Sequence, residues 1–503
     1  MNYDFILPKI NIDENASSDE VDLYLSNYRD QVKDIFYTNN MTYLSKLNKF
    51  DFLDVYISEY APFIFASVTT EDFELNNYQM MEIITSDIEV ETLYIQKPDE
   101  IYETKMTSAF PAVNLPSDLN NGYAYDGTGV NIGLLEYLGI VDDSNVNFLN
   151  SNLTVRNVWY YTEHITDHAM RVGSIIGANT GIARGAHIYS VELSGSPSSE
   201  VEWLLDNNVN IINNSWGDSS PNGEYASTSA YFDYIVYTSR VTVVVAAGND
   251  GNVSGYVGNP GLGYNVITVG NSYDTGAIYV SSSYDEAFSI SKPTLTAPGY
   301  SISVPNFPNT EYIDGVWYLL TCGTSFSAPI VTGSIALLMQ RYPILKMYPE
   351  KIISTITAAS SPVSGFNDFD TSGLEEKVGS GMFNYNDCST VYLNGRSFSF
   401  SESHESEYVS EKRVYLSAGT DIRISLAWLI NSENNTQTDK VTDLDLHFAY
   451  DNGTIITTSS SGGNNIEFID YTITSSGYYR IKVYQFGPIN CEGVIYGSYT
   501  YNT

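Results

Sequence analysis

The chain has 503 residues, of which 43% are hydrophobic, and 60 acidic against 23 basic residues give it a formal net charge of −37. This length predicts two to four domains, and the hydrophobic content suffices for packed cores, which excludes wholesale disorder. Nucleic acid and anionic membranes are excluded as partners, because an acidic surface repels both.

Residues 1–110 are acidic and mixed in pattern, and predict a small α+β domain. Apolar residues at helical spacing predict a helix over Glu20–Tyr37, and the stretch from Phe63 reads strand, helix, strand. The first 20 residues have no basic start and no long apolar core, so no signal peptide is predicted. The protein is therefore extracellular if a signal was removed, and cytoplasmic otherwise. No run of 18 apolar residues predicts a membrane span.

Residues 111–390 alternate short apolar strands with helical stretches. The strands read VNIGLLE, AHIYSVEL, VNIINNS, VTVVVAAG and NVITVG. This alternation predicts an α/β domain with a doubly wound, mostly parallel sheet. Reactive groups in such a fold gather at the carboxyl ends of the strands.

Residues 391–503 alternate apolar and polar residues without helical stretches, and they predict an all-β sandwich. Asp451-Asn452-Gly453 lies between two such runs and is typical of a hairpin turn. Asp443, Asp445 and Asp451 could bind a structural calcium ion through their oxygens. The chain has three cysteines, Cys322, Cys388 and Cys491. We expect packed free thiols, with a Cys388–Cys491 bridge as the alternative.

The stretch TCGTSFSAPIVTGSIALLMQRYP, residues 321–343, has small residues around Ser325 and then an apolar helix that Pro343 ends. Ser325 is thus expected at a helix N-terminus. Backbone N–H groups and the helix dipole stabilise an oxyanion there. Taken alone, a serine at this position is more typical of a helix cap.

Five segments together resemble the subtilisin-like serine proteases, or subtilases. GTSFSAP resembles the nucleophile motif of that family, and VVVAAGN its strand that ends in the oxyanion asparagine. INNSWG resembles the substrate-binding strand, and KPTLTAPG the stretch before the nucleophile. HAMRVGSIIGANTGIARGA resembles the histidine helix. The resemblance covers about 280 residues in the middle of the chain, and it implies a subtilisin-like catalytic domain.

The resemblance implies a role for each motif residue. Ser325 is the nucleophile, and His168 is the base that takes its proton and passes it to the leaving amine. The Asn249 amide, with the Ser325 N–H, holds the oxyanion. His164 competes with His168 for the role of base. On one helix, His164 and His168 would form an i, i+4 pair that also suggests a metal site, with Asp167 adjacent, but no third ligand is evident, so no metal is predicted.

The acid of the triad departs from the family pattern V-x-D-[S/T]-G. The strand VNIGLLE ends in Glu136, and Gly139 follows three positions on instead of two. The extra methylene moves the carboxylate oxygen by about 1.3–1.5 Å unless the backbone retreats. A carboxylate of either length can fix the histidine tautomer, so Glu136 is the expected third member. The alternatives are Asp142, Asp143 and a degraded, inactive triad.

Substrate is expected as an extended strand beside the backbone of Ser215, Trp216 and Gly217. The Trp216 side chain either walls the pocket or packs in the core. Asp218 and Asp250 are candidate pocket acids.

The segment from about 45 to 100 resembles the subtilase propeptide, with autocleavage expected within 100–115; a plain N-terminal domain is the alternative. The prediction is a serine endopeptidase with a Glu-His-Ser triad that acts on proteins or peptides. It requires no cofactor for catalysis and carries an intramolecular propeptide. The first alternative is an inactive pseudoprotease that serves as a peptide-binding scaffold. The second is a chain whose main role lies in the sandwich, as an adhesion or carbohydrate module.

Overall fold

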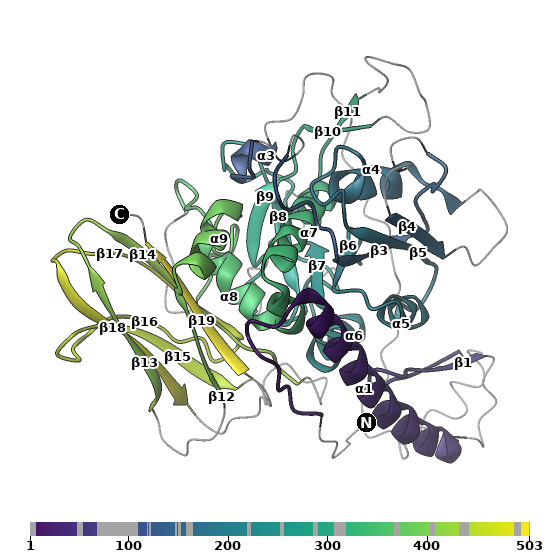
Figure 1. The fold of residues 1–503 in the computed structure, drawn as a ribbon, viewed down its shortest axis with the longest axis horizontal. Helices are drawn as coiled ribbons and strands as arrows, with labels where there is room; N and C mark the ends of the chain where they lie inside the picture. Colours follow the sequence, from purple (N-terminus) through teal and green to yellow (C-terminus); the bar gives the residue numbers. More distant parts are fainter. Residues whose placement is uncertain are drawn as a thin grey trace.

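The structure is a computed structural model in three parts: an N-terminal helix with a hairpin, a central α/β unit and a C-terminal β unit (Figure 1). The residues that it describes are 7–47, 54–67, 109–117, 119, 122–145, 148, 152–156, 164–218, 223–251, 256–284, 290–305, 318–366, 373–401, 408–431, 442–486 and 494–501.

The central sheet confirms the predicted parallel arrangement. Within the described residues it has seven strands in the order β4-β5-β3-β6-β7-β8-β9, and every neighbouring pair is parallel. The strands are β3 (Asn131–Tyr137), β4 (Asn152–Arg156), β5 (His187–Leu193), β6 (Ile211–Asn214), β7 (Thr242–Ala246), β8 (Ile267–Ser272) and β9 (Leu295–Pro298). The edge strand β4 was not predicted, because it is only partly buried and lacks a continuous apolar run.

Helices cover both faces of this sheet. The helices are α3 (Ala109–Ala112), α4 (Asp167–Gly177), α5 (Ser198–Asp206), α6 (Ser227–Ser239), α7 (Thr324–Arg341), α8 (Pro349–Ala359) and α9 (Tyr385–Leu393), with the 3-10 helix η2 (Pro343–Met347) and the hairpin of β10 (Ile302–Pro305) and β11 (Tyr318–Thr321).

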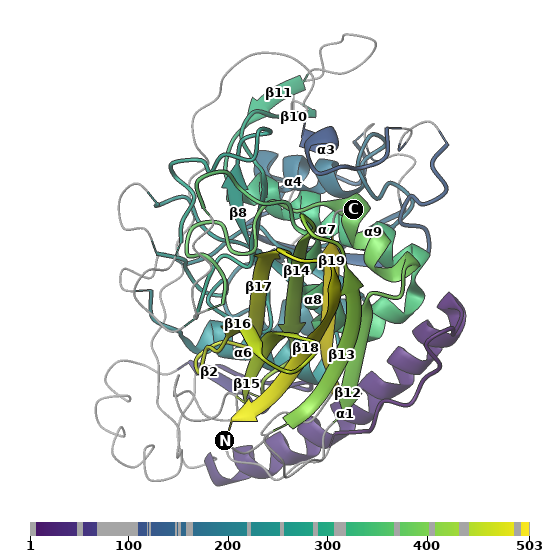
Figure 2. The same cartoon turned by 90° about the vertical axis from the view of Figure 1, so that its left-hand side faces the viewer.

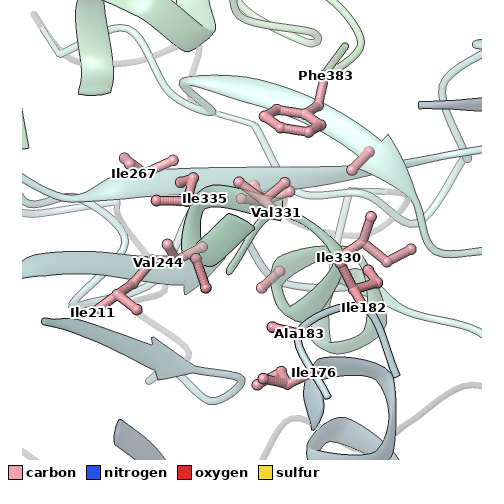
Figure 3. Packing of buried hydrophobic residues seen from close by; sticks show 14 of the residues in the cluster. Ile176, Ile182, Ala183, Ile211, Val244, Ile267, Ile330, Val331, Ile335 and Phe383 are labelled. Carbon is pink, nitrogen blue, oxygen red and sulfur yellow. The ribbon is translucent and has the colours of Figure 1, made fainter. Parts of the chain in front are cut away.

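Side chains of β3 alternate between the two faces. Ile132 and Leu134 join the cluster of α4 and α7, whereas Leu135 joins the cluster of α5 and α6. Figure 3 shows Val331 and Ile335 of α7 packed against apolar side chains of the strands.

The C-terminal part forms the predicted sandwich beside α8 (Figure 2). Two sheets of four described strands have the orders β12-β19-β14-β17 and β13-β18-β15-β16, with antiparallel pairs throughout. The strands are β12 (Ser397–Ser401), β13 (Tyr408–Leu416), β14 (Asp421–Ala427), β15 (Asp443–Tyr450), β16 (Ile455–Ser459), β17 (Ile466–Thr472), β18 (Gly477–Phe486) and β19 (Val494–Tyr501). The predicted hairpin turn joins β15 to β16, where Gly453 has a φ of 90°.

The three carboxylates considered for calcium do not converge. Asp443 and Asp445 lie at the start of β15, while Asp451 follows its far end and bonds to Arg413 at 2.7 Å. In the described part of the chain, no three His, Cys, Asp or Glu side chains are grouped to hold a metal ion. Structural calcium elsewhere stays a prediction.

Two further sequence predictions concern the cysteines and the membrane. Cys322 and Cys388 are buried free thiols, as expected, and Cys491 lies outside the described residues. None of the described helices has the length and apolar character needed to span a bilayer.

The N-terminal helix α1 (Ser18–Leu47) is longer than the predicted helix Glu20–Tyr37. A capping box starts it: the Glu20 carboxylate accepts from Ser17 N at 2.8 Å, and Glu20 N donates to Ser17 Oγ at 3.4 Å. Its buried stripe consists of Val21, Leu25, Tyr28, Val32 and Phe36. This stripe packs on α6 and η2.

The strand, helix and strand expected from Phe63 lie mostly outside the described residues. Two short strands, β1 (Asp54–Ile57) and β2 (Ile64–Ser67), form an antiparallel hairpin there. Residues 68–100 of the propeptide-like segment are not described.

Replacing Asp22 by asparagine is expected to lower the free energy of unfolding by about 2 to 4 kcal/mol, because a buried ammonium loses its charged partner. Lys346 Nζ lies 2.7 Å from both Asp22 carboxylate oxygens, and the Lys346 side chain is fully buried. Burial lowers the pKa of Lys346, and Asp22 opposes that shift. Urea unfolding measures the change. Asp30→Asn, at an exposed position of α1, is the control, and equal stabilities of the two variants would refute the buried-pair argument.

Candidate active site

The predicted site residues lie at the carboxyl edge of the parallel sheet and at the start of one helix. Glu136 lies at the end of β3, Ser215 directly follows β6, and Asn249 follows β7. Ser325 is the second residue of α7, which packs against β6 and β7. Because β3, β6 and β7 are adjacent and parallel, their ends meet at one edge.

The carboxylate of Glu136 bonds to the imidazole of His168. Glu136 Oε2 lies 2.6 Å from His168 Nδ1, and the Glu136 side chain is only 2% exposed. Its other oxygen, Oε1, has no hydrogen-bond partner among the described residues. A buried carboxylate on Nδ1 leaves Nε2 as the ring nitrogen that can accept a proton.

The turn after Glu136 holds the histidine segment in register. The chain turns at Leu138, whose φ is 53°, and Ile140 then forms a parallel bridge with Ile165. A Cβ on Gly139 would lie 2.1 Å from Thr166 Oγ1, so only glycine allows this close approach. Thr166 caps α4, accepting from Ala169 N at 3.2 Å. The longer Glu-to-Gly spacing therefore belongs to a turn that brings α4 beside the end of β3.

Ser325 is buried at the N-terminus of α7, as the sequence predicts. Its hydroxyl donates to the Ser215 carbonyl at 3.2 Å, and the described residues include no hydrogen bond between Ser325 and His168. His168 does lie against the next residue along, since the His168 and Phe326 ring centroids are 5.7 Å apart. Catalytic hydrogen bonds often form only once substrate is bound, so this geometry is compatible with a serine–histidine pair.

The side chain of Asn249 is held with its amide nitrogen unused. Its Oδ1 accepts from Thr324 N at 2.9 Å and from Thr324 Oγ1 at 3.1 Å. Its buried Nδ2 has no hydrogen-bond partner in the described part of the chain. A Cβ on Gly323, whose φ is 139°, would stand 3.2 Å from that nitrogen. The site thus holds an oriented donor beside the nucleophile, and unpaired buried donors are rare enough to indicate a function.

The Ser215–Gly217 segment directly follows β6 and is buried. Within the described residues, none of its backbone groups bonds to another strand. The Ser215 carbonyl instead accepts from the side chain of Ser325 on α7. Trp216 is 4% exposed and packs near Phe232, with ring centroids 6.2 Å apart. Its side chain therefore packs in a core cluster, as one of the two alternatives expects.

Neither rival acid bonds to His168 in the described part of the chain. Asp142 accepts from Ser144 N and Ser144 Oγ within its own turn, and Asp143 is exposed. The candidate pocket acid Asp218 accepts from Asn259 Nδ2 at 3.1 Å.

The idea that His164 and His168 share one helix is wrong. Helix α4 begins at Asp167, because Thr166 is an extended cap residue with φ −118° and ψ 146°. His164 instead bonds to Glu192 at 2.7 Å.

Sequence reasoning missed two contributors. Thr324 was quoted within the motif, but its grip on Asn249 depends on a contact across 75 residues. Glu192 was not considered, although it ends a strand in the same manner as Glu136. That parallel was the signal that could have found it.

Comparison with known proteins identifies the family of this chain. The model of the "Subtilase family" matches residues 47–381, more than half of the chain. The chain belongs to the subtilase family. This subtilase is accordingly a subtilisin-like serine peptidase.

Three similar proteins illustrate the range of likeness. Subtilisin DY of Bacillus licheniformis is 27% identical over 247 residues, which are 46% of this subtilase and 84% of the relative. The extracellular serine proteinase of Thermus sp. is 31% identical over 206 residues, 39% of this chain and 46% of the relative. The structure of fervidolysin from Fervidobacterium pennivorans, described as a keratinolytic enzyme related to subtilisin, has 20% identity and a TM-score of 0.45. The match covers 75% of this chain and 59% of the fervidolysin chain.

Proposed function

We propose that this subtilase is a serine endopeptidase that hydrolyses peptide bonds of proteins through an acyl-enzyme, with Glu136, His168 and Ser325 as its triad. The 2.6 Å bond from buried Glu136 to His168 Nδ1 carries the proposal, because it sets the ring to accept a proton at Nε2. The family membership supports the reaction class. The proposed reaction needs no cofactor.

Acylation begins when the Ser325 hydroxyl turns from the Ser215 carbonyl toward the substrate. Its oxygen attacks the scissile carbonyl carbon while His168 Nε2 takes the proton, and Glu136 stabilises the imidazolium. The new O–C bond leaves a negative charge on the former carbonyl oxygen. Asn249 Nδ2 and the N–H groups at the start of α7 donate to that oxyanion. The leaving amine takes the proton from His168, and water then frees Ser325 by the same steps.

Substrate binds as an extended strand along Ser215–Gly217 in this proposal. Among the described residues, the backbone groups of that segment pair with no other strand, which supports strand addition, in which main-chain hydrogen bonds hold the peptide. The net charge of −37 favours neutral or basic substrates over acidic ones.

A fluorophosphonate probe tests the proposed chemistry, because it labels only a serine that an adjacent base activates. We expect one label per chain on Ser325, located by mass spectrometry of the digested protein, together with cleavage of an unfolded protein substrate. Binding of peptides without label and without cleavage would contradict the proposal and would favour an inactive scaffold.

Replacing Asn249 by alanine is expected to lower kcat by about 10²- to 10³-fold, because the oxyanion loses one fixed donor. That range is the one known for the corresponding donor of subtilisin, a relative of this chain. Steady-state cleavage of an internally quenched peptide measures it. Asn386→Ala, at an exposed position of α9, serves as control. A kcat within about twofold of the unmodified protein would remove Asn249 from the mechanism.

The propeptide belongs to the same proposal. We infer that residues of the segment 45–100 act as an intramolecular propeptide and that cleavage falls within 100–115. Sequencing the N-terminus of the active protein tests this: a start within that range is expected, and an active protein that retains residues 45–100 intact contradicts it.

A further inference from the structure

A second carboxylate–imidazole pair lies beside the first. Glu192 on β5 is the register partner of Glu136 on β3, and the two strands are parallel neighbours (Figure 1). Glu136 bonds to His168 Nδ1 at 2.6 Å, and Glu192 bonds to His164 Nδ1 at 2.7 Å. Side chains of register partners in a parallel sheet point to the same face, and neighbouring strands are about 4.8 Å apart. The two carboxylates therefore stand side by side at the edge of the sheet.

The two pairs hold opposite ends of one short segment. His164 is tied to Glu192 by its ring, and its carbonyl accepts from Ile140 N at 2.8 Å. His168 is tied to Glu136 four residues later. The segment 164–168 is thus fixed from both strands, so a change at Glu192 reaches His168 through a few bonds.

Charged groups on neighbouring elements can be named for the described part of the chain. Glu200 on α5 and Arg156 on β4 lie close enough that Glu192 and Arg156 act in opposite directions on the pKa of Glu200, which burial raises. On α4, Asp167 pairs with Arg171 at 3.1 Å. The carboxylate of Asp142 is bonded within its own turn.

We propose that Glu192 and His164 are positioning residues for the reaction: they hold segment 164–168 against Glu136, and they set the charge beside His168. The proposal rests on the proposed role of His168 as the base. Neither residue touches the reacting atoms in this proposal, and both act through His168.

The electrostatic consequence has a definite sign. An unneutralised carboxylate at 192 stabilises the imidazolium of His168, so His168 loses its proton at higher pH. A neutral amide at 192 removes that stabilisation, and any charge left on His164 then repels the imidazolium. His164→Gln leaves the carboxylate without its imidazole partner, whereas Glu192→Gln removes the carboxylate. The titration midpoint of His168 in His164→Gln should therefore lie above that in Glu192→Gln, by about 0.5 to 1 pH unit at low salt.

The experiment uses the full chain with Ser325→Ala in the background, so that no self-cleavage interferes. The chain has five histidines, few enough for NMR titration of ¹³Cε1-labelled rings, with His168 assigned by its own substitution. His187→Gln is the matched control, since His187 lies at the opposite end of β5 and bonds to Thr154. We expect it to leave the His168 midpoint unchanged. High salt should narrow the gap between the two test variants.

In chains that keep Ser325, the midpoint of the acid limb of kcat/KM should likewise lie at higher pH in His164→Gln than in Glu192→Gln. Coincident His168 midpoints in the two variants would overturn the proposal whatever happens to the rate, because a purely structural role lowers activity without separating them. The double variant His164→Gln/Glu192→Gln, which carries neither charge, should lie between the single variants, and a midpoint outside that interval also overturns it. The NMR titration needs no turnover, so a negative result there is distinct from a failure of the proposed triad. The fluorophosphonate label on Ser325 tests the triad separately.

Discussion

Replacement of Ser325 by alanine is expected to lower kcat by about 10⁴- to 10⁶-fold, because no other group in the proposed site can form the acyl-enzyme. The upper value is the loss known for subtilisin itself, a relative of this chain, and is carried over on that ground. Cleavage of an internally quenched peptide at saturating concentration measures kcat. The fluorophosphonate label should disappear in the same variant.

Ser334→Ala is the matched control for this change. Ser334 lies on the same helix, is fully buried and donates to the Ile330 carbonyl, so its loss removes an equivalent hydroxyl away from the chemistry. We expect that variant to keep kcat within about threefold. Peptide cleavage that persists unchanged in Ser325→Ala would show that the activity does not come from the proposed nucleophile.

Replacement of Glu136 by glutamine is expected to cost about 10⁴-fold in kcat. An amide cannot stabilise the imidazolium, and it can donate to Nδ1, which would present the wrong tautomer to Ser325. Glu136→Asp should fall between glutamine and the unmodified chain. The shorter side chain withdraws its oxygen by about 1.3–1.5 Å from a ring nitrogen that now lies 2.6 Å away. Steady-state kinetics of the three proteins across pH provide the measurement.

Asp142→Asn separates Glu136 from its rival. The Asp142 carboxylate serves its own turn, so its loss should change kcat by less than about threefold. A large loss in Asp142→Asn combined with an active Glu136→Gln would reverse the assignment of the acid. If the kcat of Glu136→Asp equalled that of the unmodified protein, the longer acidic side chain would not be needed with the longer turn that follows it.

Several features could be predicted from the sequence because they depend on residues close together in the chain. The parallel strands were recognisable from short apolar runs, and the start of α7 from small residues before a long apolar stretch. The order of the motifs predicted that Glu136, His168, Asn249 and Ser325 belong to one site. The structure agrees in bringing Glu136 to His168 and Asn249 to the residue before Ser325.

Other features depended on which strands become neighbours. The sequence around Glu192 shows an acid near a strand end, but that it stands directly beside Glu136 follows from the pairing of β3 with β5. His164 was expected on the helix of His168, and the cap at Thr166 excludes that. The burial of Trp216 near Phe232 of α6 likewise follows from the tertiary structure.

The sequence by itself determined the kind of protein: an α/β peptidase domain with its nucleophile at a helix start, a longer acid than usual and a β-sandwich behind it. Periodicity and capping are local properties, and motif order is linear along the chain, so all three can be read without coordinates. Only the tertiary structure decided that Glu136 reaches the base, that the Asn249 amide is left unused, and that a second carboxylate stands next to the first. Those facts arise from contacts between residues far apart in the chain, and they depend on sheet order and register, which no local pattern encodes.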